Sequence, residues 1–518
     1  MENGRRREPV RRGRKARHEN PPPATAVAPG VLGGRFKPLT DAEIQNVHRT
    51  VLDVLEKIGM ADPIPILEEH ALARGCKLNE HGRLCFPRAL VEDVIAGAGQ
   101  AIQWCGQDER YDLDLSGTRV HTYGGGEAVN ALDLGADQYR PSTIHDVYDF
   151  ARLVDRMDNI HAFSRLVVAT ELQDLRVCDI NTAYASVAGT QKHTALTFSY
   201  AEHIDPTLEM LYMVAGGEKK FRERPFCHGG GCPIISPLRY GVHNSEVCIE
   251  ATKFGSPVWI VTAPQAGATA PAALAGTLVQ VIAEALAALL MVDLVHPGYP
   301  VIMGPWPFVS DLRTGSFSGG GGEEAVLSAA AAQVINHYGL VSSVGAGMTD
   351  SKLPDNQAGY EKGITVALAA LAGCNNVSES AGMVGSLMGC SYEAIVADND
   401  MLANVLRTVR GIEINEETLS YDIIDEVVHG EGHFLRQPQT LELMRSEYAY
   451  PEVADRGTHK EWEELGSPTM RQRAADRVRE ILSTHYPEYI DPDVDRKIRE
   501  KFPIVLTEED MRAGNGRW

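Results

Sequence analysis

The middle of the chain alternates short apolar runs with longer amphipathic segments. The runs predict strands, and they lie within residues 120–129, 162–172, 194–201, 224–235, 257–265, 299–308, 339–348 and 375–385. The segments between them predict helices that begin near Thr143, Asp179, Asp205, His243, Pro271, Glu323, Ala358 and Glu393. Strands that alternate with helices predict right-handed βαβ units and a parallel sheet. Eight such units favour an α/β fold of the (β/α)8 TIM barrel type over an open doubly wound sheet.

Helical periodicity continues on both sides of this region. Residues 41–60 and 88–99 predict helices before it, and residues 471–486 predict the clearest helix after it. The sequence therefore divides into four predicted regions: a disordered basic and Pro-rich tail (1–33), a mainly helical N-terminal region (34–118), the barrel (119–410) and a C-terminal helical extension (411–518).

One segment, residues 271–295, is long and apolar enough to imitate a membrane span. Gln280 and Glu284 lie in its middle, where a bilayer would penalise them. We therefore expect a buried helix and no membrane as a partner.

Charge and cysteine content narrow the class of protein. The formal net charge of −21 on 518 residues opposes binding to nucleic acid or to an anionic membrane surface. The nine cysteines are odd in number, scattered and without a CxxC pair, which indicates reduced thiols in a cytoplasmic enzyme.

In a barrel, the carboxyl ends of the strands form the active face. Several aromatic, charged and polar side chains fall at the predicted ends, and we expect them to bind substrate. They are Tyr123, Glu127, Arg165, Tyr200, His228, Gln265, Trp306 and Phe308. Aromatic faces beside carboxylates suit a quaternary ammonium ion. The alternative for each aromatic residue alone is packing in the core or at the rim.

Polar residues also crowd the end of the seventh predicted strand. Asp350, Lys352 and Gln357 there, with Glu379 at the eighth, are the candidate catalytic residues. Lys352 is a Schiff-base candidate if burial lowers its pKa, but the nearby Asp350 and Asp355 favour an ordinary ion-paired lysine.

A glycine run precedes the helix predicted at Glu323. Its residues are Gly319, Gly320, Gly321 and Gly322. Glu323 and Glu324 in the first helical turn oppose a phosphate, and no P-loop motif is present, so close approach of a cofactor or partner to bare backbone is the functional interpretation. A flexible loop is the alternative. Glycines interrupt the group His429, Glu431 and His433, so no zinc motif is predicted and we expect no intrinsic metal.

Three segments together resemble the trimethylamine methyltransferase (MttB) family of corrinoid-dependent enzymes. They are TGSFSGGGGEEA (314–325), GMTDSKLPDNQAGYEK (347–362) and GHFL (432–435), which is followed by QT where His-Thr is more usual. The resemblance covers about residues 35–485 and implies a TIM barrel. Founding members carry pyrrolysine and pass a methyl group from trimethylamine to Co(I) of a separate corrinoid protein. This chain has only ordinary residues around Thr349–Lys352, where pyrrolysine is expected.

That departure directs the prediction to the branch without pyrrolysine, whose members demethylate glycine betaine, carnitine or proline betaine. We expect a quaternary amine methyltransferase, with glycine betaine favoured, using cobalamin carried by a corrinoid partner protein in a homo-oligomer. A carboxylated substrate would also need a donor, for which Arg165, His228 and Gln265 are candidates. The alternatives are a tertiary amine methyltransferase, a barrel lyase or aldolase that uses Lys352, and a betaine-binding relative without catalysis.

Overall fold

The computed structural model describes residues 25–99 and 102–518, so most of the predicted N-terminal tail lies outside the described residues. The chain divides into two compact units. The larger contains residues 27–414 and 450–518. The smaller includes residues 415–449, with helices α13 (Tyr421–His429) and α14 (Pro438–Leu443).

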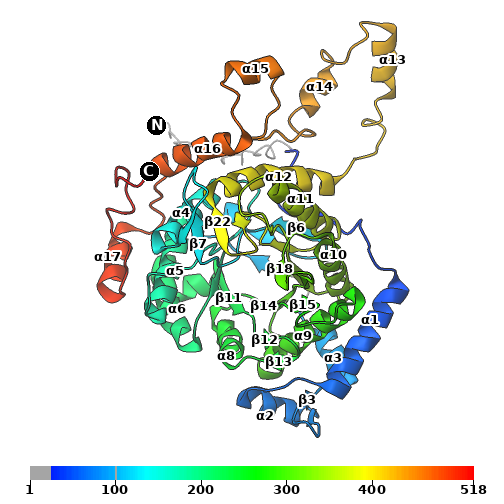
Figure 1. Cartoon of the computed structure of the whole chain (residues 1–518), viewed down its shortest axis with the longest axis vertical. Helices are drawn as coiled ribbons and strands as arrows, with labels where there is room; N and C mark the ends of the chain where they lie inside the picture. Colours follow the sequence, from blue (N-terminus) through cyan, green and yellow to red (C-terminus); the bar gives the residue numbers. More distant parts are fainter. Residues whose placement is uncertain (1–24, 100–101) are drawn as a thin grey trace, which may run out of the picture. The chain divides into compact units, whose positions relative to one another are not determined.

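A curled, mostly parallel sheet organises the larger unit (Figure 1). Its parallel strands follow the order β6 (Arg119–Thr122), β20 (Asn376–Ser378), β19 (Val341–Gly345), β16 (Val301–Pro305), β14 (Val258–Thr262), β11 (Cys227–Gly231), β10 (Thr194–Thr197) and β9 (Phe163–Ser164). Seven of them fall inside the apolar runs that predicted strands, and β6 begins at Arg119, one residue before its run. The short strand β1 (Val31–Leu32) pairs antiparallel with β6. An isolated parallel bridge joins Tyr123, after β6, to Ala162, before β9.

A helix follows each parallel strand, and Figure 1 shows these helices around the sheet. They are α4 (Ile144–Asp155), α5 (Leu175–Gly189), α6 (Ile204–Ala215), α8 (Val242–Glu250), α9 (Leu274–Val295), α10 (Gly322–His337), α11 (Asn356–Leu371) and α12 (Tyr392–Arg410). The largest difference from the predicted starts is at α5. There the Asp174 carboxylate accepts from the backbone N–H groups of Arg176 and Val177, which fixes the start before Asp179.

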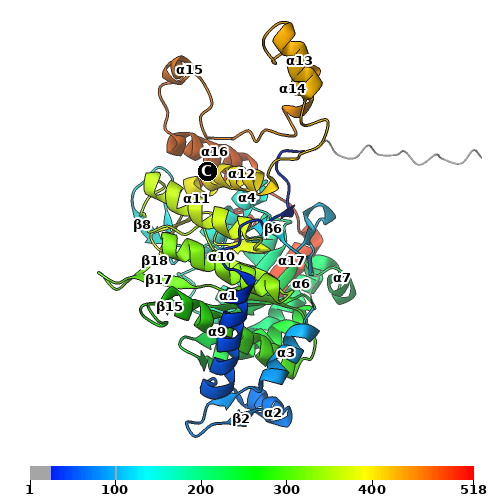
Figure 2. The same cartoon turned by 90° about the vertical axis from the view of Figure 1, so that its right-hand side faces the viewer.

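Helix α9 is the apolar segment that imitates a membrane span. Of the described helices, it alone is long and apolar enough for such a span, and 78% of its apolar window is buried within the protein. It packs against β14 and β16, and α1 (Asp41–Asp53) lies along it (Figure 2). Glu284 in its middle accepts hydrogen bonds from Ser236 Oγ at 2.6 Å and Leu238 N at 2.9 Å. The polar residue that opposed a membrane assignment therefore bonds to the rest of the protein.

The N-terminal region packs its helices against α9. It contains α2 (Pro65–Ala73), the hairpin β2 (Lys77–Leu78) and β3 (Leu84–Cys85), α3 (Arg88–Gly97), and the pair β4 (Gln103–Trp104) and β5 (Leu113–Asp114). Trp104 is fully buried and stacks on His193 at 4.8 Å and His228 at 4.9 Å between ring centroids. Because His193 directly precedes β10, this stack closes the amino end of the sheet.

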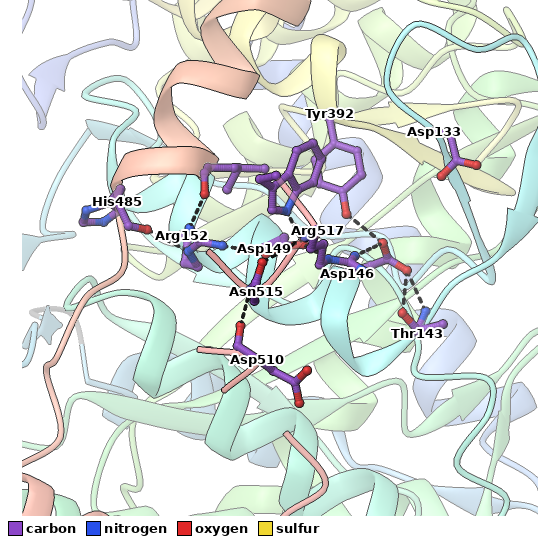
Figure 3. Close-up of polar contacts among 12 residues, drawn as sticks. Asp133, Thr143, Asp146, Asp149, Arg152, Tyr392, His485, Asp510, Asn515 and Arg517 are labelled. Atoms are coloured by element: carbon purple, nitrogen blue, oxygen red, sulfur yellow. Dashed lines mark hydrogen bonds and ion pairs between the residues drawn. The ribbon is translucent and has the colours of Figure 1, made fainter. Parts of the chain in front are cut away.

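The C-terminal part of the larger unit includes α15 (His459–Glu464), α16 (Met470–Thr484) and α17 (Pro492–Lys501). Figure 3 shows how charged side chains attach it to α4. Arg152 on α4 donates to Asp149 Oδ1 at 2.7 Å and to the Leu482 carbonyl at 2.6 Å. Arg517 bonds to both Asp146 and Asp149. These contacts join segments more than 300 residues apart in sequence.

Candidate functional site

The carboxyl ends of neighbouring strands bring a carboxylate and a guanidinium together. Arg165, directly after β9, donates from Nη2 to Glu127 Oε2 at 2.8 Å, and Thr197 at the end of β10 donates to Glu127 Oε1 at 2.6 Å. Burial alone would raise the pKa of Glu127, but the Arg165 charge and these hydrogen bonds lower it overall. Glu127 is therefore ionised, and the positive charge of Arg165 balances it.

A second carboxyl group at this end of the sheet has no cation bound to it among the described residues. Glu379 follows β20 directly and is 3% exposed, and its Oε2 atom has no hydrogen-bond partner among the described residues. Burial, together with the nearby Glu127 carboxylate, raises the pKa of Glu379 to about 8. Its backbone φ of 59° is in the left-handed region, which is uncommon and strained for a residue other than glycine.

Two glycines after β6 make room for this carboxylate. A Cβ atom at Gly125 would lie 2.9 Å from Glu379 Oε1, and one at Gly126 would lie 2.5 Å from Oε2. Any side chain at either position would push Glu379 away. The sequence GGG before Glu127 thus allows the Glu379 carboxylate to lie against bare backbone.

Aromatic rings continue from Tyr123, near this carboxylate, into the interior of the sheet through Trp259 in the first half of β14. Tyr123 and Trp259 meet edge to face with centroids 6.2 Å apart, and Trp259 and Trp306 are 5.6 Å apart. Phe308 lies 6.0 Å from Trp306. The Tyr123 hydroxyl and the Trp306 Nε1 are buried without a hydrogen-bond partner in the part of the chain that the structure describes. Aromatic rings near an unpaired carboxylate form an environment suited to an organic cation.

His228 lies deeper, in the stack with Trp104. His193 Nδ1 contacts the Cys105 carbonyl at 2.7 Å, so this nitrogen carries the proton, and His193 Nε2 accepts from His228 Nδ1 at 2.9 Å. Burial lowers the pKa of both histidines, that of His193 to about 4. In this neutral tautomer the remaining His228 nitrogen is an acceptor, so His228 does not offer the donor predicted for a substrate carboxylate.

The polar residues after β19 mostly bind one another. Asp350 accepts from Ser318 Oγ at 2.8 Å, Gly319 N at 3.0 Å and Ser386 Oγ at 2.7 Å. Three donors likewise bind Glu361: Thr349 Oγ1 at 2.5 Å, Asp350 N at 2.9 Å and Gln357 Nε2 at 2.9 Å. This arrangement ties the glycine run to the loops after β19 and β20.

The glycine run packs tightly at its start and opens at its end. A Cβ atom at Gly320 would lie 2.6 Å from the Glu361 side chain, and one at Gly319 would lie 2.9 Å from Met348 Cβ. Gly321 caps α10, and a Cβ atom at Gly322 would meet nothing within 4 Å. Of the four predicted cofactor-binding glycines, Gly321 and Gly322 are therefore the accessible ones.

Other predicted residues lie at the edge of this site. Tyr200 is 39% exposed and packs against His203 and His243. Gln265 belongs to β15 (Gln265–Ala266), in a small sheet with β17 (Phe308–Asp311) and β18 (Ser316–Ser318). Lys352 is exposed and donates to the Asp350 carbonyl at 2.6 Å. Nothing buries Lys352 in the way that a Schiff-base lysine requires.

Sequence reasoning missed several residues of these clusters. Trp259 and Thr197 lie within strands rather than after them, so a search of strand ends passes over them. The i, i+4 spacing of Gln357 and Glu361 on α11 was a usable signal for their contact. Glu324, on α10, is fully buried, and neither of its carboxylate oxygens has a partner within the described ranges. No pattern in the sequence predicted that burial.

The described residues contain no group of three or more His, Cys, Asp or Glu side chains placed to hold a metal ion. All nine cysteines are free thiols. Six of them are buried, Cys85 and Cys105 are half-buried, and Cys232 is exposed.

Comparison with known proteins gives consistent matches along nearly the whole chain. Residues 6–503 match the model of the family described as trimethylamine methyltransferase (MTTB). Trimethylamine methyltransferase MttB of Desulfitobacterium hafniense is 32% identical over 472 residues, which cover 91% of this chain and 94% of the relative. Glycine betaine methyltransferase of the same species, strain Y51, is 29% identical, covering 91% and 97%. MttB of Methanosarcina thermophila is 31% identical, covering 88% and 94%.

Proposed function

The chain belongs to the trimethylamine methyltransferase (MttB) family and is a methyltransferase. From this premise we propose that it removes a methyl group from a quaternary amine, with glycine betaine favoured, and transfers it to Co(I) of a corrinoid on a separate protein. The observation that carries the proposal is the unpaired Glu379 carboxylate beside the aromatic row Tyr123, Trp259 and Trp306. One of the relatives is named for glycine betaine, which supports this choice of substrate.

The chemistry of the substrate explains why such a site suffices. A quaternary ammonium ion loses a methyl group by breaking a C–N bond, and the electron pair stays on nitrogen, which leaves as a neutral amine. No acid has to activate that leaving group. The protein therefore has to bind the cation, align its methyl carbon with the acceptor and exclude water.

The substrate-binding roles follow from charge. The rings of Tyr123, Trp259 and Trp306 face the methyl groups, and Glu379 supplies negative charge. Arg165 is the cationic group near them, and its Nε atom is buried without a hydrogen-bond partner among the described residues. Arg165 is thus the proposed contact for the carboxylate of a betaine, with Gln265 farther out in β15.

The acceptor side of the site is proposed to lie at the glycine run. Gly321 and Gly322 present backbone to an approaching corrinoid protein, since no atom lies within 4 Å of the place where a Gly322 side chain would begin. Asp350 and Gln357 take a positioning role here, because their hydrogen bonds fix the run and the loop after β19. Lys352, exposed beside Asp350, is proposed to contact the partner or the substrate at the entrance.

We also propose that the sheet closes into a complete (β/α)8 barrel. The bridge between Tyr123 and Ala162 and the contact of α12 with α4 support closure, because both join the first βα unit to its neighbours on either side. A cytoplasmic location and a homo-oligomer complete the proposal, the location being supported by nine free thiols.

Calorimetric titration with glycine betaine, carnitine, proline betaine, choline and trimethylamine tests the substrate class. We expect binding of a carboxylated quaternary amine and none of trimethylamine. The ligand that binds is then incubated with Co(I) cobalamin, and methyl transfer is followed by loss of the Co(I) spectrum and appearance of the demethylated amine. Binding of trimethylamine alone would instead support a tertiary amine methyltransferase, and binding without transfer to any corrinoid would support a non-catalytic relative.

A further inference from the structure

We propose that binding of the cationic substrate is coupled to release of one proton from Glu379, so that the site acquires its negative charge only when the cation arrives. This inference rests on the proposed function, because it needs a methylated amine that binds at the strand ends. It concerns how the site controls its own charge, which the choice of substrate does not determine.

The geometry fixes the Glu379 carboxylate in a place where it has no protein counter-ion. Gly125 and Gly126 hold it against bare backbone, and its own left-handed backbone conformation directs it there. Arg165, the cation of this cluster, is already bound to Glu127 at 2.8 Å. An ionised, unpaired carboxylate at 3% exposure is strongly unfavourable, so in the free protein Glu379 carries a proton.

Each titratable group that faces Glu379 keeps a fixed charge near neutral pH. Glu127 stays ionised, since Arg165 and Thr197 lower its pKa overall in spite of burial. The surroundings of Cys232, with the Glu127 and Glu379 carboxylates, raise the pKa of its thiol, so it stays protonated. Burial likewise raises the pKa of Tyr123 and of Cys390, on β22 (Gly389–Ser391), so both stay neutral. Glu379, with a pKa of about 8, is the member of this group that titrates near physiological pH.

The proton balance follows from these charges. Glu127 and Arg165 together are neutral, and protonated Glu379 leaves the free site neutral. A quaternary ammonium ion has no N–H group to donate, so it gains nothing from a neutral carboxyl group but is attracted by a carboxylate. Its arrival therefore favours ionised Glu379, and the proton passes to solvent. Binding should strengthen as pH rises toward 8 and become independent of pH above that value.

Calorimetry of the full-length protein measures the released proton directly. Tetramethylammonium and glycine betaine are titrated between pH 6 and pH 9, in pairs of buffers with different ionisation enthalpies. For a group with a pKa of about 8, we expect release of about 0.9 proton at pH 7 and about 0.1 at pH 9, with affinity rising about tenfold from pH 6 to pH 7.

The E379Q variant isolates the group, because glutamine keeps the shape and cannot ionise. We expect weaker binding at pH 9 and no proton release at any pH. The matched control is E284Q: Glu284 is also a buried glutamate with a pKa that burial raises, but its partners are Ser236, Leu238 and Gln280 on the α9 side. E284Q should release protons on binding as the unmodified protein does.

The possible results distinguish failure of the proton coupling from failure of the proposed function. Binding of a methylated amine without proton release, or equal release by E379Q, overturns the coupling and leaves the proposed function standing. Failure of every methylated amine to bind overturns the proposed function and the coupling with it. The buffer comparison on the unmodified protein decides the matter even where E379Q does not fold.

Discussion

Two buried acidic clusters of this protein differ in how many partners their carboxylates have. On α4, Asp146 accepts two hydrogen bonds from Arg140 at 2.7 Å each and one from Tyr392 at 2.7 Å. Thr143 donates to it from its backbone N at 2.8 Å and from Oγ1 at 2.9 Å, and Arg517 adds a sixth contact at 3.0 Å. At the strand ends, Glu379 Oε2 has no partner in the described chain. Both side chains are almost completely buried.

The difference separates a structural use of buried charge from a functional one. Burial alone would raise the pKa of Asp146, but Arg140, Tyr392 and Arg517 lower it well below the ordinary range. Nothing compensates Glu379 in this way, and its pKa is raised to about 8. A saturated network holds segments together, whereas an unsaturated group is available to a ligand at some cost in stability.

The largest expected effect is on the saturated cluster. D146N should lower the free energy of unfolding by about 3–5 kcal/mol, because the amide nitrogen faces donors and the Arg140 and Arg517 charges lose their partner. Urea denaturation measures this loss. The control is D133N, which removes the 59% exposed partner of the same Arg140 and should cost about 1 kcal/mol or less. A loss from D146N no larger than that from D133N would contradict the structural role of the α4 cluster.

The second prediction concerns Glu379, whose ionisation should destabilise the folded protein, whereas that of Asp146 stabilises it. Because the folded-state pKa of Glu379 is raised, the unfolded chain loses this proton first, and stability falls as pH rises from about 4.3 toward 8. E379Q lacks this contribution of residue 379 to the pH dependence of stability. Between pH 5 and pH 7 the unmodified protein should therefore lose about 2.5 kcal/mol more of its free energy of unfolding than E379Q. Unfolding free energies of both proteins at the two pH values test this, and parallel curves would show that Glu379 is ionised in the free protein.

The smallest effect is expected at Tyr123. Its hydroxyl is buried without a partner among the described residues, so Y123F should change the free energy of unfolding by about 0.5 kcal/mol or less. The ring face remains, so affinity for a quaternary amine should change less than about threefold, while Y123L should lower it about tenfold. Calorimetry of the two variants compares them. Equal losses in Y123F and Y123L would assign the interaction to the hydroxyl instead of the ring.

Local sequence patterns predicted much of the fold. Seven of the eight parallel strands lie inside a predicted apolar run, and β6 begins one residue before its run. Helix α4 begins directly after Thr143. Period and capping residues predict such positions because they act over a few neighbours along the chain. Closure of the barrel and the predicted domain limits stay predictions. At the site, the strand-end rule selected Glu127, Arg165 and Glu379, whose roles are likewise still proposed. It passed over Trp259, which contacts Tyr123 from within β14.

The sequence by itself therefore determined which residues stand at the ends of strands, since that depends on local periodicity. Only the tertiary structure decided which of those residues have partners. Asp146 and Glu379 are both acids next to an element end, and Arg140, six residues before Asp146, supplies only part of its compensation. Asp146 is saturated by Tyr392 and Arg517 from distant segments, while Gly125 and Gly126 leave Glu379 beside bare backbone. Electrostatic compensation acts through space, so the charge state of a buried acid is set by contacts that lie hundreds of residues apart in the chain.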